Sequence, residues 1–152
     1  MFASIARWSA PAMARHDRAY RTWVRPRLRS GEVIALIAEL PEGPVASGVL
    51  WWREDQPRPG VGVVRLPYVM SVYTEPKLRG RGLASRIVQE LVRAARAGGA
   101  SRITLHASDM GRSVYAQLGF ERTWEMRKWL DLRYVRARTK AMAGRGRAGS
   151  RA

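Results

Sequence analysis

The stretch SVYTEPKLRGRGLAS, residues 71–85, decides the fold that we expect for this chain. Its first residues include β-branched and aromatic side chains, which are typical of a strand end. Pro76 then ends the strand, because proline has no backbone donor. Gly80 and Gly82 follow among arginines, and a helical pattern begins at Leu83. The order of strand, glycine loop and helix predicts an anion site.

The chemistry of this loop suits a phosphate. The first N–H groups of a helix have no partner within the helix, and the helix dipole is positive there. Glycine lets the backbone approach an anion without a Cβ in the way. Arg79 and Arg81 add charge-assisted donors. We therefore expect the phosphate to contact the backbone of Gly80, Arg81, Gly82, Leu83, Ala84 and Ser85.

Three phosphate motifs can be compared with the loop. A P-loop needs lysine and then serine or threonine after the second glycine, and Leu83 stands there instead. A dinucleotide fingerprint needs glycine at Ser85 and an acidic residue about 20 positions later, where residues 98–102 offer none. The third motif is arginine, two residues, glycine, one residue, and glycine or alanine. The chain satisfies it with Arg79, Gly82 and Ala84.

Length and composition indicate one globular domain. The chain has 152 residues, of which 46% are hydrophobic, so it can bury a core. It has no cysteine, and its two histidines are far apart, so we expect neither disulfides nor a bound metal. No apolar run reaches the roughly 18 residues that a membrane span needs. Without an apolar leader at the N-terminus, we expect a cytoplasmic protein with no membrane partner.

The charge is strongly basic. The formal net charge is +16, from 28 basic and 12 acidic residues, and 25 of the basic residues are arginine. Residues 133–152 contain seven basic residues, no acidic one and little to bury, which predicts a disordered tail after a domain of residues 1–132. A basic domain attracts an anionic ligand such as coenzyme A. It also suits RNA or DNA, so a nucleic-acid partner for the tail stays open.

The remaining pattern alternates helices and strands. A stripe of apolar residues at helical spacing makes residues 83–97 the clearest helix, and the strands on either side of it should be parallel. We further expect a helix over residues 2–28 that ends or kinks at Pro26, and strands over 32–40 and 45–52. In chain order the others are a loop over 53–60, a strand over 61–74 with a bulge or bend at Pro67, a strand over 101–107, a short helix over 112–118 and a last strand over 120–130.

With this element order, the glycine loop and the segment LHASDMGRSVYAQLGF, residues 105–120, resemble the GNAT superfamily of N-acetyltransferases. The resemblance runs from about residue 31 to residue 130. It implies an α/β (α+β) fold with a mixed, mostly antiparallel sheet, a central parallel pair splayed at the cofactor, and helices on both faces. The family usually opens with a strand that is missing or very short here, so part of the acceptor site is expected to be absent, reshaped or supplied by another subunit of a homodimer.

The resemblance also implies a chemistry. Acetyl-CoA would donate its acetyl group directly to a primary amine of a small molecule or peptide, with no metal. The pyrophosphate would lie on the glycine loop, and Tyr115 would protonate the leaving thiolate. The alternative for Tyr115 is simple packing between helix and sheet. The pantetheine and the acetyl carbonyl would contact the backbone of Val72, Tyr73 and Thr74.

The rest of the site is open at this stage. Glu32, Glu39, Glu75 and Glu125 are bases by residue type only, and water could also deprotonate the amine. His106 is expected to be a strand residue beneath a helix. A second function class also remains: a GNAT-like module with weak or no turnover that binds acetyl-CoA or nucleic acid. No motif identifies the acceptor.

Overall fold

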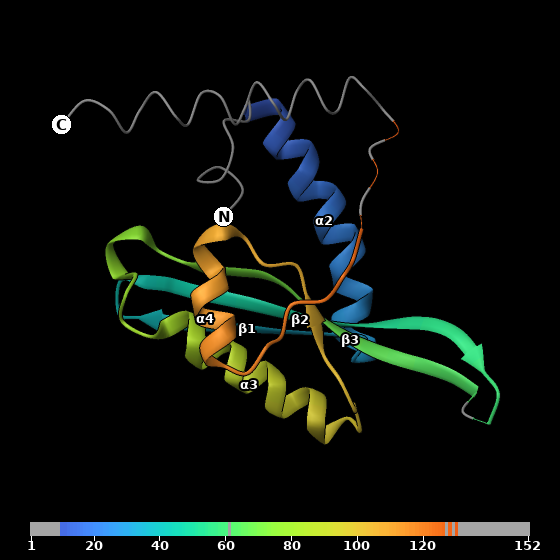
Figure 1. The fold of residues 1–152 in the computed structure, drawn as a ribbon. Coiled ribbons are helices and arrows are strands. Elements are labelled where there is room, and N and C mark those ends of the chain that lie inside the picture. Colours follow the sequence, from blue (N-terminus) through green and yellow to red (C-terminus); the bar gives the residue numbers. More distant parts are fainter. Residues whose placement is uncertain (1–9, 61, 127, 129, 131–152) are drawn as a thin grey trace.

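The computed structural model describes residues 10–60, 62–126, 128 and 130. Within them, one four-stranded sheet lies between helices (Figure 1). In chain order the elements are α2 (Ala10–Ser30), β1 (Val33–Leu40), β2 (Gly43–Arg58), β3 (Gly62–Thr74), the 3-10 turn η1 (Pro76–Leu78), α3 (Leu83–Ala97), β4 (Thr104–Leu105), the 3-10 turn η2 (Asp109–Gly111) and α4 (Arg112–Gln117).

The sheet is mixed, in the order β1-β2-β3-β4. The pairs β1–β2 and β2–β3 are antiparallel, whereas β3 and β4 are parallel and joined through α3. Only two residue pairs connect the parallel strands, Tyr68 with Thr104 and Val69 with Leu105. The expected fold class, a mixed and mostly antiparallel sheet with one parallel pair and helices on both faces, is confirmed, but the parallel pair lies at the edge of the described sheet and not at its centre.

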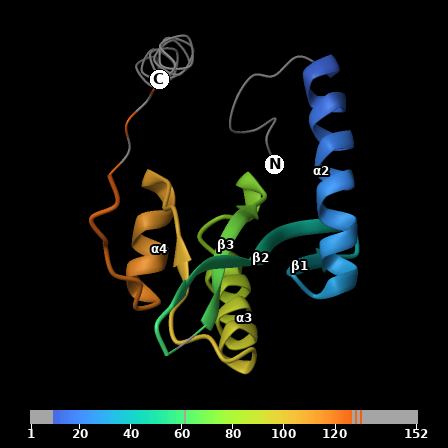
Figure 2. The ribbon, with the colours of Figure 1, turned by 90° about the vertical axis from the view of Figure 1, so that its right-hand side faces the viewer.

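The two faces of the sheet carry separate apolar clusters, and α3 and α2 lie on opposite sides of it (Figure 2). On one face, α3 covers alternate residues of the strands, including Leu50, Trp52 and Val69. On the other face, Val24 of α2 packs on Val33 and Val49. The alternation of strand side chains therefore divides the sheet into an α3 face and an α2 face.

The helix α3 begins and ends at the expected residues, Leu83 and Ala97. Its apolar stripe is buried against the sheet through Ile87, Val88, Leu91 and Ala95. Two glycines follow it, and a Cβ added to Gly98 would lie 2.4 Å from the Trp52 ring. The sheet thus holds the N-terminal end of α3 beside the end of β3.

The central strand has its bulge at a different place from the one expected. Pro67 pairs in register with Trp52, and β4 pairs only with Tyr68 and Val69, so a residue without an N–H is tolerated at Pro67. The bulge lies instead at Ser71, whose φ of 55° is in the left-handed region. The register shifts there between Ser47 and Val49 of β2, so that one residue of β2 faces two of β3.

The expectations for Pro26 and for residues 53–60 need correction. Of the two outcomes expected at Pro26, an end or a kink of the helix, the end is wrong, because α2 continues through Pro26 to Ser30. The Arg27 Nη1 donates to the Trp23 carbonyl at 2.9 Å, which supplies a donor in the turn that proline weakens. The expected loop at 53–60 is largely strand, because β2 continues to Arg58 and its irregular part, between Asp55 and Arg58, contains the proline.

The C-terminal expectations fail in part. The strand expected at 101–107 is only Thr104–Leu105, and the described residues from 120 to 130 form no strand. Trp124 and Met126 are each 95% exposed, and among the described residues no strand pairs with their segment. Residues 2–9 of the first expected helix, and the tail with its boundary at 132, lie outside the described residues. In the part of the chain that the structure describes, no helix combines the length and the apolar character of a membrane span.

Candidate functional site

The glycine loop presents its backbone to solvent between β3 and α3. Gly80 and Gly82 have φ values of 78° and 77°, which favour glycine, and no atom lies within 4 Å of a Cβ built on either. Within the described residues, no backbone hydrogen bond is donated by the N–H groups of residues 80–85. Gly82 is the N-cap of α3. These free donors meet the positive end of the helix dipole, which is the geometry that binds an anion.

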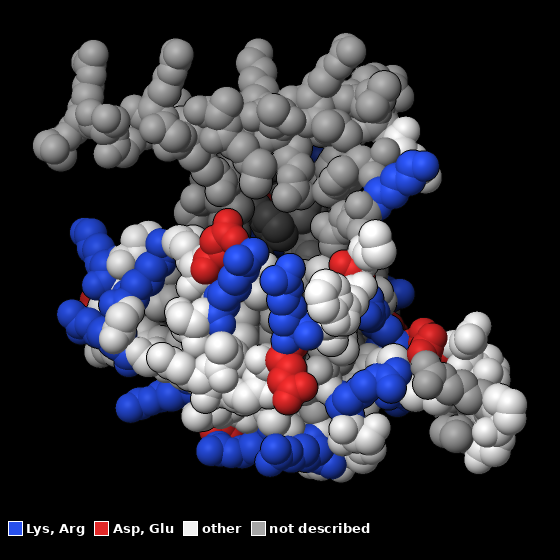
Figure 3. Space-filling model, viewed as in Figure 1, with Lys and Arg blue, Asp and Glu red and all other residues white. Residues whose placement is uncertain are grey.

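Basic side chains surround this loop. Arg79 and Arg81 are both exposed, and Arg79 Nε donates to the Thr74 carbonyl at 3.3 Å. That bond holds the Arg79 side chain against the end of β3 and leaves its terminal nitrogens for a ligand. Lysine and arginine side chains are spread over the face of the molecule drawn in Figure 3, with fewer acidic side chains among them. The electrostatics of the loop therefore favour a polyanion.

The bulge of β3 leaves an open strand edge next to the loop. Beyond Val69, the edge of β3 that faces away from β2 pairs with no strand within the described residues. Val72, Tyr73 and Thr74 follow the bulge and are half-buried, and within the described residues the buried Thr74 hydroxyl has no hydrogen-bond partner. These three residues therefore offer backbone donors and acceptors along the strand edge that is open where β3 and β4 separate.

Tyr115 lies on α4, half-buried, with its ring 5.8 Å from that of Phe120. The fit is tight, because a Cβ on Gly111 would lie 2.7 Å from the Tyr115 ring. Burial raises the pKa of the Tyr115 phenol, and Tyr68 raises it further. Tyr115 is thus protonated at neutral pH, as a proton donor must be.

Comparison with known proteins identifies the family. The model of the acetyltransferase (GNAT) family matches residues 2–120. The chain belongs to the GNAT acetyltransferase family. No curated protein matches it.

Solved structures agree with this assignment. A GCN5-related N-acetyltransferase from Ralstonia eutropha JMP134 is 27% identical, with a TM-score of 0.70 over 85% of each chain. A predicted acetyltransferase from Clostridium acetobutylicum, crystallised with acetyl-CoA, is 28% identical, with a TM-score of 0.68 over 74% of this chain and 73% of that one. AAC(6')-Iy, in complex with the bisubstrate analogue CoA-S-monomethyl-acetylneamine, shares the fold at 19% identity, with a TM-score of 0.63 over 76% and 80% of the two chains.

In this GNAT chain, His106 does not lie beneath a helix as expected. It follows β4 directly, its side chain is 45% exposed, and its two ring nitrogens contact Tyr68 and Glu125. The sequence separations are 38 and 19 residues, so no local pattern indicated this cluster. Of the acidic residues considered as bases, Glu125 is the one that the fold brings next to a histidine.

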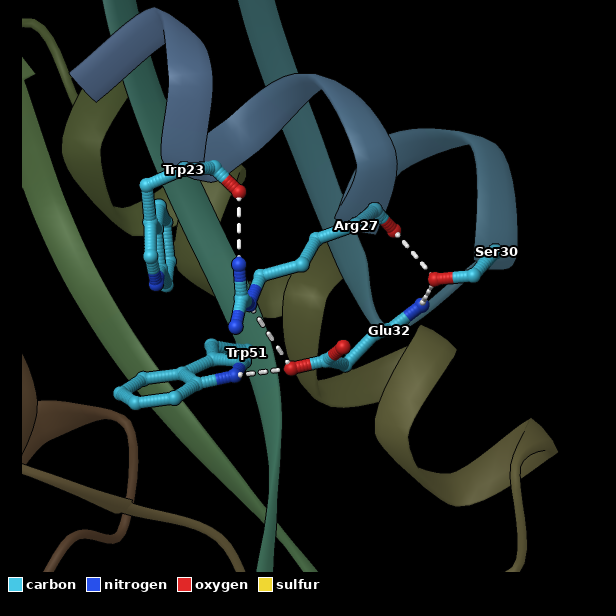
Figure 4. Close-up of polar contacts among 5 residues, drawn as sticks. All are labelled: Trp23, Arg27, Ser30, Glu32 and Trp51. Carbon is cyan, nitrogen blue, oxygen red and sulfur yellow. Dashed lines mark hydrogen bonds and ion pairs between the residues drawn. The ribbon is translucent and has the colours of Figure 1, made fainter. Parts of the chain in front are cut away.

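The acidic residue Glu32 has a structural role in the GNAT domain (Figure 4). Its carboxylate accepts hydrogen bonds from Trp51 Nε1 at 2.9 Å and from Arg27 Nε at 3.0 Å. The bond from Trp51, followed by the positive charge of Arg27, lowers the pKa of Glu32. The Trp23 and Trp51 rings meet edge to face at 5.2 Å beside it. Glu32 therefore joins α2 to the sheet as a fixed anion, which makes it a poor base.

Two hollows of the surface lie away from the glycine loop. One of about 690 Å³ is formed along α2 by residues including Arg18 and Trp23. The other, of about 570 Å³, lies at the C-terminal end of α3 beside Trp52 and Gly98. Neither includes a residue of the loop or the bulge. The candidate site is therefore defined by the backbone groups of the loop and of the open edge of β3, and not by either of these hollows.

Proposed function

We propose that this protein transfers the acetyl group of acetyl-CoA to a primary amine of a small molecule or peptide by direct attack. The observation that supports it is the continuity of two features along one strand. The open edge of β3 after the bulge leads directly into the glycine loop, whose N–H groups donate no backbone hydrogen bond within the described residues. A ligand with a pyrophosphate and an extended amide-containing arm matches both.

Each part of the ligand has partners of fitting chemistry. The pyrophosphate would contact the backbone of residues 80–85 and the side chains of Arg79 and Arg81, which are exposed. The two amides of the pantetheine arm would add to the free edge of β3 at Val72, Tyr73 and Thr74, as a peptide adds to a sheet edge. The acetyl-CoA found with the Clostridium acetobutylicum relative supports this ligand.

Acetyl transfer then needs one proton donor and one proton acceptor. The amine nitrogen bonds to the acetyl carbon, the carbon–sulfur bond breaks, and the thiolate needs a proton. The buried phenol of Tyr115, with its raised pKa, is the donor that we assign. The proton that leaves the amine needs an acceptor on the other side of the reacting carbon.

The test is release of free thiol from acetyl-CoA in the presence of five amines of different classes: tyramine, spermidine, lysine, neamine and a short peptide with a free N-terminus. We expect steady turnover with at least one of them and calorimetric binding of acetyl-CoA without any. Binding of acetyl-CoA with no turnover on any amine would favour the alternative, a GNAT-like module that binds without catalysis. Absence of acetyl-CoA binding would refute both.

A further inference from the structure

Three titratable side chains from three segments meet where β3 and β4 separate. Tyr68 lies on β3, His106 directly follows β4, and Glu125 lies in the segment after α4. The Tyr68 hydroxyl contacts His106 Nδ1, with the two ring centroids 5.6 Å apart. On the other side of the imidazole, His106 Nε2 lies 2.7 Å from Glu125 Oε1. The three groups form one continuous chain of hydrogen bonds.

The direction of the protons follows from the chemistry of the end groups. An ionised carboxylate can only accept hydrogen bonds, so His106 Nε2 carries the proton and donates it to Glu125. In the neutral imidazole, Nδ1 is then the acceptor, and the Tyr68 hydroxyl donates to it. A phenol oxygen that gives up its own proton can accept another on its lone pairs. Glu125 thus prepares His106 to receive a proton through Tyr68.

The hydrogen-bonded chain of Tyr68, His106 and Glu125 lies at the centre of the candidate site. Tyr68 and Thr104 form the first of the two pairs between β3 and β4, so His106 stands immediately past the last one. Trp51, opposite Tyr68 on β2, contacts α2 through Trp23, so Tyr68 belongs to the α2 face of the sheet. The open edge of β3 that we propose for the acyl donor begins at the same point of separation.

The charged groups around the chain suit proton transfer. The Arg53 guanidinium of β2 lies 4.2 Å from the centre of the Tyr68 ring. Its positive charge stabilises negative charge that develops on the phenol when the hydroxyl proton leaves. On α4, burial raises the pKa of the Tyr115 phenol, and Tyr68 raises it further.

We propose that Tyr68, His106 and Glu125 form the proton relay that deprotonates the acceptor amine, an inference that rests on the proposed function. The protonated acceptor amine passes one proton to the Tyr68 oxygen, while the hydroxyl proton of Tyr68 passes to His106 Nδ1. The neutral amine then bonds to the acetyl carbon. The carbon–sulfur bond breaks, the thiolate takes the proton of Tyr115, and the Tyr115 oxygen regains a proton from the nitrogen of the new amide. Release of the His106 proton to water completes the cycle.

In this relay Tyr68 is the catalytic residue, because it contacts the amine. His106 holds the proton, and Glu125 is a positioning residue that fixes the tautomer of the imidazole. The competing explanation is that the three contacts merely attach the C-terminal segment to β4. With side chains 45% and 61% exposed, the pair of His106 and Glu125 would then contribute little to stability. The two explanations differ in how the rate depends on pH.

The decisive experiment measures kcat/KM against pH in the full-length protein, with acetyl-CoA and whichever of the five panel amines is acetylated. We expect Tyr68→Phe and His106→Gln each to lose roughly 10²-fold at pH 7 and Glu125→Gln to lose less. The losses should shrink as the pH approaches the pKa of the amine, because a neutral amine needs no base. A loss of equal size at every pH, or no loss, would overturn the relay.

Two controls separate this result from a failure of the proposed function. Acetyl-CoA should bind all variants as it binds the unmodified protein, in calorimetric titration. Glu121→Gln removes another exposed acid from the same segment and should leave kcat/KM unchanged. If Glu121→Gln lowers the rate as much as Glu125→Gln, the effect belongs to the segment and the relay is wrong.

A measurement without any acceptor completes the test. The chain has two histidines, so His16→Gln leaves His106 as the only imidazole in a nitrogen NMR spectrum. We expect a neutral imidazole protonated at Nε2, and a change in the tautomer mixture in Glu125→Gln. A neutral His106 that carries its proton at Nδ1 could not accept the proton of Tyr68, and this result would overturn the proposal even if no amine in the panel were a substrate.

Discussion

Replacement of Gly82 by aspartate separates ligand binding from folding. Gly82 has a φ of 77°, where a residue with a Cβ is strained by about 1–2 kcal/mol. An acidic group at a helix N-terminus returns about 0.3–1 kcal/mol, and no atom lies within 4 Å of the new Cβ. We therefore expect Gly82→Asp to lower the free energy of unfolding by no more than about 2 kcal/mol, as measured by urea denaturation.

The effect on acetyl-CoA should be much larger. A carboxylate about 4 Å from one phosphate charge is repelled by about 4 kcal/mol at an effective dielectric constant of about 20. That energy corresponds to roughly a 10³-fold rise in Kd. The new carboxylate would also accept hydrogen bonds from the N–H groups that the pyrophosphate needs. Calorimetric titration of the folded variant measures the loss.

Gly60→Asp is the matched control for this prediction. Gly60 also has a φ of 77° and no atom within 4 Å of an added Cβ, but it lies in the turn between β2 and β3. The Gly60→Asp variant should lose a similar amount of stability and keep its affinity for acetyl-CoA. Near-normal affinity in folded Gly82→Asp, or an equal loss of affinity in Gly60→Asp, would refute the assignment of the loop.

Three further variants test other parts of the structure. Tyr115→Phe should reduce kcat by roughly 10²-fold with little change in acetyl-CoA affinity; an unchanged kcat would mean that Tyr115 only packs. Because the folded pKa of Glu32 is lowered, its contribution to stability is complete above the ordinary value of about 4.3 and disappears as the pH falls through the folded value. Glu32→Gln should therefore flatten the fall of Tm between about pH 5 and pH 3, and an identical pH dependence would contradict this role. Gly48→Ala places a Cβ 2.5 Å from Ile87 Cγ2 and should cost about 1–3 kcal/mol in urea denaturation; full stability would show that α3 can move away from β2.

The local features were predictable from the sequence. The period of the apolar residues defines α3, and a pair of glycines ends it, so its bounds at Leu83 and Ala97 follow from neighbours in the chain. The glycine loop depends on the same short stretch. Its position between β3 and α3 could be predicted because it depends only on where the strand ends and where the helix begins.

Features that depend on pairing were not predictable in the same way. The segment after Phe120 has strand-like residues, but a strand exists only where a partner strand is in register, and Trp124 stays exposed instead. We expected the bulge at Pro67 because proline disrupts a strand, whereas the register of β3 with β2 places it at Ser71. The sequence did not indicate that His106 contacts Tyr68 and Glu125, because these partners are 38 and 19 residues away from it in the chain. Only the parallel register of Tyr68 with Thr104 could have suggested the contact between Tyr68 and His106.

The bulge at Ser71 has a consequence for how such a site can arise. Val69 and Val72 both pack on the α3 face although they are three residues apart, because one extra residue lies between them. Removal of Ser71 would restore strict alternation while leaving both valines on the same face. The hydrophobic pattern would be intact, but the backbone groups that the bulge frees would return to the sheet. A single codon, inserted or lost, could therefore create or remove this part of the open strand edge without changing any side chain of the core.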